Sequence, residues 1–253
     1  MPTGEQSAPI ARAPTAEDDC LLFQPDAIVP ELFGAFSSAA RVALTGAAPV
    51  ALDVLQSIES EMSDRPSVLL WSSAVALSRA WFGGHSTLPP ACDRRVLDLG
   101  AGLGVCSLTA AALGANAVVA TEIEPALSAL RASLARNSHL DGYDRIRAVE
   151  LYFGQGLEES SLGGEVFDIV LGTDLLYASR LHPLLLSTLH HVLTPGASTL
   201  VLVYEQRGGE QAFFDAATRE LGLIGEHLAI DGHGDMMRFF IGTRRPPAEH
   251  ELQ

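Results

Sequence analysis

Cysteine is scarce in this 253-residue sequence, which holds Cys20, Cys92 and Cys106 and no others. The number is odd, and no two of the three lie close enough in sequence to form a pair of metal ligands. The sequence therefore predicts neither a disulfide framework nor a zinc site. Free cysteines suit a reducing compartment, so we expect a cytoplasmic or nuclear location.

Basic residues are also few, because 16 Lys and Arg stand against 31 Asp and Glu, which gives a formal net charge of −15. Nucleic acids and anionic membranes are polyanions that bind through clusters of positive charge. The composition therefore argues against both as partners and favours a partner with positive charge.

Long hydrophobic runs are missing as well. The most apolar stretch of the first part of the chain, at 42–55, is interrupted by Gly46, Pro49 and Asp53 and is too short to span a bilayer. Residues 1–19 have neither a basic start nor an apolar stretch, so we expect a disordered tail there rather than a signal or transit peptide. We expect no membrane association.

A regular alternation of strand and helix patterns begins near residue 94. The predicted strands are 94–100, 117–122, 145–151, 167–174, 198–205, 223–230 and 236–244. The predicted helices are 105–114, 124–137, 180–193 and 209–222. This order predicts an α/β fold with a doubly wound, mostly parallel, Rossmann-like sheet of seven strands that ends in an antiparallel pair.

The chain before this alternation is less regular. We expect residues 20–90 to form an N-terminal layer packed on a core domain at 91–245, with a C-terminal tail at 246–253. Within the layer, helices are predicted over 51–62 and 69–82.

A glycine-rich turn, "VLDLGAGLGV" at 96–105, follows the first strand of the core domain. Its glycines are Gly100, Gly102 and Gly104, whereas the dinucleotide fingerprint requires its third glycine at the position of Val105. Asp98 would also repel a pyrophosphate. Both features disfavour NAD or FAD.

S-adenosylmethionine fits this turn better, because it carries an ammonium and a sulfonium and lacks phosphate. Asp98 would face its amino acid end, and the glycines would make room for it. Glu122, at the end of the second strand, would accept hydrogen bonds from the ribose hydroxyls. The alternative is a turn that serves only packing, with Asp98 capping the helix that follows.

Three segments carry a resemblance to a known family: "VLDLGAGLG", "VVATEIEPALSALRASLARN" and "FDIVLGTDLLY". Together they resemble the class I, seven-β-strand, S-adenosylmethionine-dependent methyltransferases. Within that class the sequence is similar to the small intracellular protein-lysine methyltransferases that modify chaperones, calmodulin and translation elongation factors. The resemblance covers residues from about 68 to 206.

Single positions match motifs of that branch. Its acidic-x-x-aromatic motif matches Asp174 to Tyr177, its tryptophan before the core domain matches Trp71, and its helix-ending asparagine matches Asn137. Where the family has Leu-Asp-Trp-Gly, this chain has "LYFG" at 151–154. Phe153 retains an apolar face for the adenine. Tyr152 replaces the acid of the family motif, so whether this position has a polar role stays open.

The resemblance implies methyl transfer to a lysine of an intracellular protein. Because the chain is acidic, we expect that protein to present an exposed basic segment, and we expect the enzyme to be a monomer. Asp174 would attract the cationic side chain and orient its amine, and Tyr177 would line the channel. The alternative roles are a cap on the helix that starts near Ser179 for Asp174, and core packing for Tyr177.

Other functions stay open at this point. They are a class I methyltransferase acting on a small molecule, arginine or histidine, a non-catalytic binding platform, and a dehydrogenase. We expect no metal site, because Asp231, His233 and Asp235 alternate with glycines in a pattern typical of a turn.

Overall fold

The computed structural model describes residues 39–46, 48–55, 69–124, 126–155, 162, 164–229 and 236–246. The tail predicted at 1–19 and the turn predicted at 231–235 lie outside these residues. Among the described residues no helix combines the length and the apolar character that crossing a membrane requires. In the same part of the chain, no group of three or more His, Cys, Asp or Glu is arranged to hold a metal ion.

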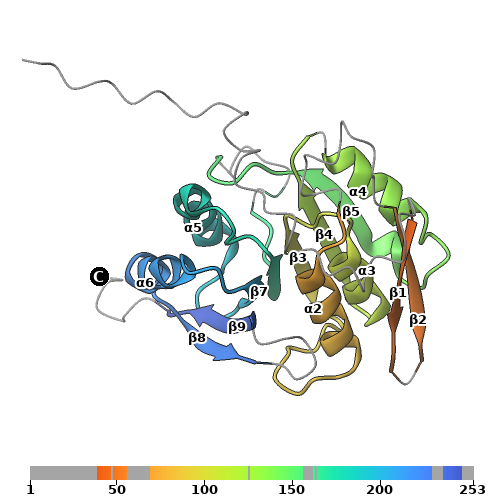
Figure 1. Cartoon of the computed structure of the whole chain (residues 1–253), viewed down its shortest axis with the longest axis horizontal. Helices are drawn as coiled ribbons and strands as arrows, with labels where there is room; N and C mark the ends of the chain where they lie inside the picture. Colours follow the sequence, from red (N-terminus) through yellow and green to blue (C-terminus); the bar gives the residue numbers. More distant parts are fainter. Residues whose placement is uncertain are drawn as a thin grey trace, which may run out of the picture.

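The centre of the molecule is a seven-stranded sheet with the order β5-β4-β3-β6-β7-β9-β8 (Figure 1). Its strands are β3 (Arg95–Leu99), β4 (Ala117–Glu122), β5 (Ile146–Glu150), β6 (Ile169–Thr173), β7 (Thr199–Glu205), β8 (Leu223–Leu228) and β9 (Met237–Arg244). The last strand in sequence, β9, runs antiparallel to both β7 and β8, and the other neighbouring strands of the sheet pair in parallel. The predicted fold class is confirmed.

Helices cover both faces of this sheet (Figure 1). They are α2 (Ser72–Phe82), α3 (Val105–Ala112), α4 (Ala126–Ala135), α5 (His182–Val192) and α6 (Glu210–Leu221). One hydrophobic cluster joins α5 and α6 to Leu97, Leu99 and Val170, whose side chains point to that face. A second cluster joins α2 and α3 to Val96 and Ile169 on the opposite face. Successive side chains of a strand alternate between the two faces, so these buried strands are apolar on both.

A β-hairpin precedes α2, and it corrects one prediction from the sequence. The hairpin pairs β1 (Ala39–Leu44) with β2 (Val50–Leu55) in antiparallel register, so the helix predicted over 51–62 is wrong for the part that the structure describes. The buried side chains of the hairpin are Val42, Leu44, Leu52 and Val54. Their spacing of two residues is that of a strand with one buried face. The helix predicted over 69–82 is confirmed as α2.

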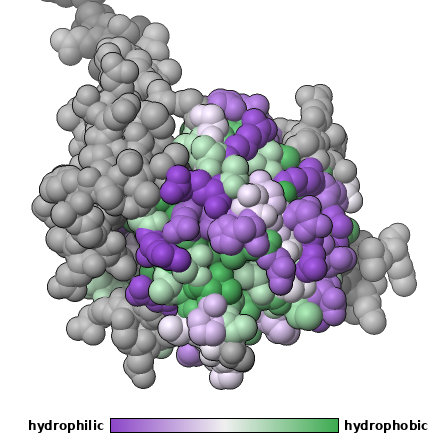
Figure 2. Space-filling model, turned by 90° about the vertical axis from the view of Figure 1, so that its right-hand side faces the viewer, coloured by the Kyte–Doolittle hydropathy of each residue, from purple (hydrophilic) through white to green (hydrophobic). Residues whose placement is uncertain are grey.

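The hairpin packs on the outer side of α3 and α4, where its buried side chains meet Leu108 and Leu130. Asn137, just beyond α4, fixes it in place, because its side-chain oxygen accepts from the Asp53 N–H at 2.8 Å and its amide donates to the Asp53 carbonyl at 2.7 Å. On the face of the molecule shown in Figure 2, hydrophilic residues are interspersed with hydrophobic ones.

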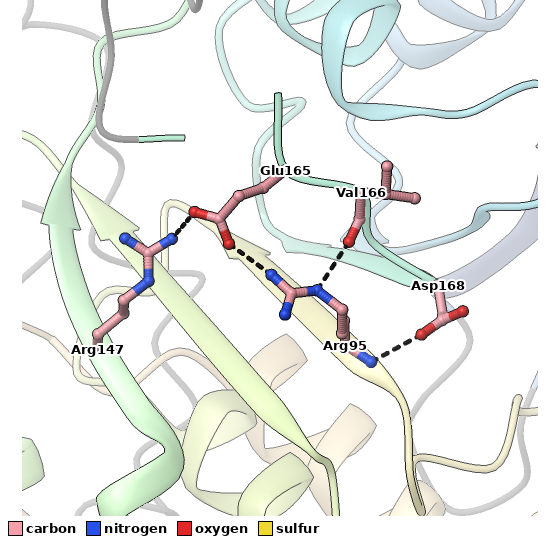
Figure 3. A network of polar contacts seen from close by, with 5 residues as sticks. All are labelled: Arg95, Arg147, Glu165, Val166 and Asp168. Atoms are coloured by element: carbon pink, nitrogen blue, oxygen red, sulfur yellow. Dashed lines mark hydrogen bonds and ion pairs between the residues drawn. The ribbon is translucent and has the colours of Figure 1, made fainter. Parts of the chain in front are cut away.

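A polar network ties the amino ends of the strands together (Figure 3). Arg95, the first residue of β3, donates from its side chain to Glu165 at 2.5 Å and from its backbone N–H to Asp168 at 2.8 Å. Glu165 also pairs with Arg147 of β5. This network lies at the edge of the sheet opposite the glycine-rich turn, so it supports the sheet without taking part in the site at the carboxyl ends.

Candidate functional site

The glycine-rich turn leaves the carboxyl end of β3 beside the point where the strand order reverses, which is where doubly wound folds bind ligands. Gly100, Gly102 and Gly104 all have positive φ angles, of 58, 55 and 76°. A Cβ atom at Gly100 would lie 2.8 Å from Leu175, and one at Gly104 would lie 2.8 Å from Leu134. At these two positions glycine therefore serves close packing of the turn against its neighbours.

Asp98 lies in β3 just before this turn and is 1% exposed. Its Oδ2 atom accepts a 2.6 Å hydrogen bond from the Ser107 hydroxyl, and the Ser107 backbone N–H adds another. Ser107 is the third residue of α3, whose N-cap is Gly104 without a side-chain cap, so Asp98 contacts the first turn of this helix from β3. Its other oxygen, Oδ1, is buried and has no hydrogen-bond partner among the described residues.

Burial, with a smaller effect from the charge of Glu122, raises the pKa of Asp98 to about 7, against the effect of the Ser107 hydrogen bonds. A buried carboxylate oxygen without a donor is costly in free energy. The contacts with Ser107 therefore account for only one oxygen of the Asp98 carboxylate, and the other oxygen suits a ligand with a positively charged donor.

Glu122 ends β4 and holds the glycine-rich turn from the side. Its Oε1 atom accepts from the Gly102 N–H at 3.1 Å, and its Oε2 atom accepts from the Ile123 N–H at 2.9 Å. Burial raises its pKa, against the effect of these hydrogen bonds. Each carboxylate oxygen can accept a second hydrogen bond, so Glu122 can still bind a pair of hydroxyl groups.

Two aromatic residues are predicted to contact the cofactor, and the structure places one of them, Phe153, at the glycine-rich turn. The Phe153 Cζ atom lies 3.9 Å from where a Cβ of Gly100 would stand, so the ring lies beside the turn. Trp71 immediately precedes α2, and its carbonyl accepts a 3.3 Å hydrogen bond from the Val75 N–H. The neighbouring Tyr152 has its pKa raised by desolvation and by the charge of Glu150, to which its hydroxyl is hydrogen-bonded.

Asp174 follows β6 at the same edge of the sheet and is the second acidic centre. It is 8% exposed, and its φ of 53° lies in the left-handed region, which few residues other than glycine adopt. The Ser73 hydroxyl donates to its Oδ2 atom, and the Glu205 N–H donates to its Oδ1 atom at 3.4 Å. Burial raises its pKa, while the Ser73 hydrogen bond and the charge of Arg207 lower it.

The alternative roles considered for the Asp174 motif are not supported. Neither the 3-10 turn Ser179–Leu181 nor α5 has a side-chain cap, and the hydrogen bonds of the Asp174 carboxylate go to Ser73 and Glu205. Tyr177 is 50% exposed, so it does not pack in the core. Desolvation and the charge of Glu122 raise the pKa of the Tyr177 hydroxyl.

Several functional residues were missed from the sequence. Ser73 and the Glu205 backbone bond to Asp174, and Ser72 and Arg207 bond to the Glu205 carboxylate. Ser73 and Asp174 are 101 positions apart in the sequence. The position of Glu205 at the end of a predicted strand was a usable signal, because the carboxyl ends of parallel strands meet at one edge. His182 was missed too. It is buried and its Nε2 atom lies 3.2 Å from the Leu176 carbonyl, so it supports the loop that carries the Asp174 motif.

The sheet order, the antiparallel β9 and the acids at the carboxyl ends of β3 and β4 define the Rossmann-like fold of class I methyltransferases. The chain is similar to the 16S rRNA N2 G1207 methyltransferase of T. thermophilus, with a TM-score of 0.54, 20% identity and coverage of 83% of this chain and 52% of that one. It is also similar to a putative SAM-dependent methyltransferase from Streptococcus mutans, with a TM-score of 0.56, 12% identity and coverage of 84 and 57%.

The family described as lysine methyltransferase matches residues 52–220, and the chain belongs to this family. Protein N-lysine methyltransferase METTL21A of Danio rerio is 35% identical over 136 residues, which are 54% of this chain and 59% of the relative. Protein-lysine N-methyltransferase EFM3 of Chaetomium thermophilum is 34% identical over 138 residues, with coverage of 51 and 41%. EEF1A lysine methyltransferase 3 of Mus musculus is 31% identical over 123 residues, with coverage of 48 and 50%. The chain thus spans between 41 and 59% of the length of these relatives.

Proposed function

We propose that this protein is an S-adenosylmethionine-dependent protein-lysine N-methyltransferase. The observation that carries the proposal is the pairing of two buried acidic centres at one edge of the sheet. Asp98 and Glu122 lie at the ends of β3 and β4, and Asp174 follows the neighbouring strand β6. Two acidic centres suit a reaction between a cationic cofactor and a cationic side chain. The family membership and the names of the relatives support the same activity.

The residues of the first centre fit S-adenosylmethionine. The unpartnered Oδ1 atom of Asp98 would accept from its ammonium group, and Glu122 would accept from its ribose hydroxyls. Phe153 and Trp71 would supply apolar contacts. When bound, the cofactor would supply a methyl group on a sulfonium: a neutral amine would attack the methyl carbon in line, and the thioether would leave.

The second centre would receive the lysine. A free lysine has a pKa of about 10.4, so its amine must lose a proton before it reacts. Asp174 would attract the ammonium, and once its proton has passed to solvent water, the Oδ1 atom of Asp174 would accept a hydrogen bond from the neutral amine. That atom accepts only a long 3.4 Å bond from Glu205 and retains capacity for a second donor. Tyr177, half exposed, would line the way in.

The substrate that suits this site is a protein with an exposed basic segment, because the chain carries a net charge of −15. The same charge supports the proposal that nucleic acid is not a substrate. We extend the proposal to a monomer that acts in the cytoplasm or nucleus, where its free cysteines stay reduced.

The experiment that tests the proposal uses S-adenosylmethionine with a radiolabelled methyl group and an unmethylated extract of the source organism. We expect a discrete, protease-sensitive band on a denaturing gel, and methyl-lysine after hydrolysis of that band. Label in arginine, histidine, nucleic acid or small molecules would overturn the lysine assignment, and cofactor binding without any transfer would point to a non-catalytic platform.

A further inference from the structure

The first two residues of α2 hold two different carboxylates. The Ser73 hydroxyl donates to Asp174, and the Ser72 hydroxyl donates to the Oε1 atom of Glu205 at 3.2 Å. Asp174 follows β6 and Glu205 ends β7, which are neighbouring parallel strands. The two carboxylates therefore lie at the same edge of the sheet, and the Glu205 N–H bonds directly to Asp174.

The charges at this place do not balance. Arg207 donates to the Oε2 atom of Glu205 at 3.2 Å, and its charge also acts on Asp174, whose pKa it lowers. The charge of Glu205 acts on the same carboxyl in the opposite direction. Two carboxylates are thus close to one guanidinium, so the group carries a net negative charge when both acids are ionised.

Another cation can replace Arg207 as the partner of Glu205. The Arg207 side chain is 35% exposed and that of Glu205 is 19% exposed, whereas Asp174 is buried. Ion pairs that solvent reaches are weak, because water screens them and the long side chains lose entropy when they are fixed. A second cation can therefore approach Glu205 at little cost, and Ser72 still holds the carboxylate in place.

We propose that Glu205 determines specificity for a cationic substrate: together with Asp174 it binds the lysine ammonium, and Arg207 pairs with Glu205 until the lysine arrives. This inference rests on the proposed lysine methyl transfer and adds a residue to it. The ammonium supplies the second positive charge that two carboxylates require. A neutral side chain does not supply it, so the arrangement selects lysine over hydroxyl or amide groups.

The test compares the full-length protein with its Glu205→Gln and Arg207→Gln variants. Glutamine keeps one oxygen that can accept from Ser72, but its amide group cannot accept from Arg207, so the variant removes the charge of Glu205 and its ion pair with Arg207 together. Transfer of labelled methyl groups is measured against increasing amounts of unmethylated extract, and cofactor affinity is measured separately by calorimetry. Glu226→Gln, an exposed change on β8, controls for the altered net charge.

We expect Glu205→Gln to raise the extract concentration at half-maximal transfer by about fivefold, while the plateau and the cofactor affinity stay near those of the wild type. Arg207→Gln should lower that concentration, because a competing cation is gone, and Glu226→Gln should leave it unchanged.

Equal half-maximal concentrations for Glu205→Gln and the wild type would overturn the inference, and so would a rise for Arg207→Gln. Loss of cofactor binding in Glu205→Gln would also overturn it, since Glu205 would then be structural. If the wild type labels no lysine at all, the proposed function itself fails. If the wild type labels lysine and Glu205→Gln has the same half-maximal concentration, only the proposed role of Glu205 fails.

Discussion

The side-chain amide of Asn137 pairs with both backbone groups of Asp53, and through them the end of α4 holds the hairpin formed by β1 and β2. Asn137 is completely buried and also donates to the Ser133 carbonyl, so each of its polar atoms has a partner. The asparagine that links this chain to its family by resemblance thus has a structural role, away from the two acidic centres.

Asn137→Ala should lower the free energy of unfolding by about 2–3 kcal/mol, because buried backbone groups of Asp53 lose their partners. Urea denaturation measures this. Asp53→Asn is the matched control, since the contact uses only the backbone of Asp53 and the exposed ion pair with Arg41 contributes little. Equal losses of unfolding free energy in both variants would contradict a stabilising role for the hydrogen bonds between the Asn137 side chain and the Asp53 backbone.

Cofactor affinity should depend on pH through Asp98. Because burial places the pKa of this carboxyl at about 7, roughly half of it is protonated at neutral pH in the free protein. An ammonium group requires the ionised form. Affinity for S-adenosylmethionine should therefore fall about tenfold from pH 8 to pH 6, as a group with this pKa titrates. Calorimetry at both values checks the effect, and Asp98→Asn should bind weakly with no such slope.

The same carboxyl should destabilise the folded protein at high pH. Its pKa is raised on folding, so its contribution to stability is fully present below the unfolded value near 4 and is lost as the pH rises through about 7. Relative to Asp98→Asn, the wild type should gain about 1.4 kcal/mol in free energy of unfolding when the pH falls from 8 to 6. Denaturation curves without cofactor test this, and a gain on raising the pH would be the opposite sign.

Asp174→Asn should lose methyl transfer by at least about a hundredfold and keep cofactor affinity, because it removes the charge that attracts and orients the lysine. Asparagine tolerates the left-handed backbone at this position, so the fold should persist. Asp93→Asn is the matched control, since Asp93 has a similar φ of 58° and is exposed. Transfer that survives in Asp174→Asn would remove this residue from the reaction.

Gly104→Ala should destabilise the protein by about 3 kcal/mol or more, because the new methyl group would meet Leu130 and Leu134 at 2.8 Å and the backbone has positive φ. Gly84→Ala separates these two causes. Gly84 has a φ of 75°, close to the 76° of Gly104, but nothing lies within 4 Å of its Cβ position. We expect a loss of about 1 kcal/mol there, measured by urea denaturation. Similar losses at both positions would show that the backbone alone requires glycine.

The strands of the main sheet and its mostly parallel, doubly wound class followed from the sequence because each of its buried strands is a short apolar run bounded by turn residues. The wrong helix prediction over 51–62 arose because this segment forms a strand only through contacts with distant residues. Val50, Leu52 and Val54 alternate as in a strand, but their partners Val42 and Leu44 lie on the other arm of a hairpin. Whether such a segment forms a strand or a helix depends on what its buried face packs against. Here that face packs against α3 and α4, which are distant in sequence.

The acids of the site were predictable because Asp98, Glu122 and Asp174 each stand where a strand ends or just beyond it. Their partners were not. The serines that hold Asp174 and Glu205 come from α2, which reaches these strands only after folding. The unpartnered oxygen of Asp98 is likewise a property of the packed core and has no signature in the chain.

The most direct test of the two-centre account uses S-adenosylmethionine with a deuterated methyl group. Unmethylated extract is treated with the wild type or with Asp174→Asn, and tandem mass spectrometry locates the heavy methyl groups. The account predicts heavy methyl on lysine within basic segments of one or a few proteins, and its loss with Asp174→Asn although calorimetry shows the variant still binding the cofactor. Heavy methyl on another residue type, or equal labelling by both proteins, would contradict it.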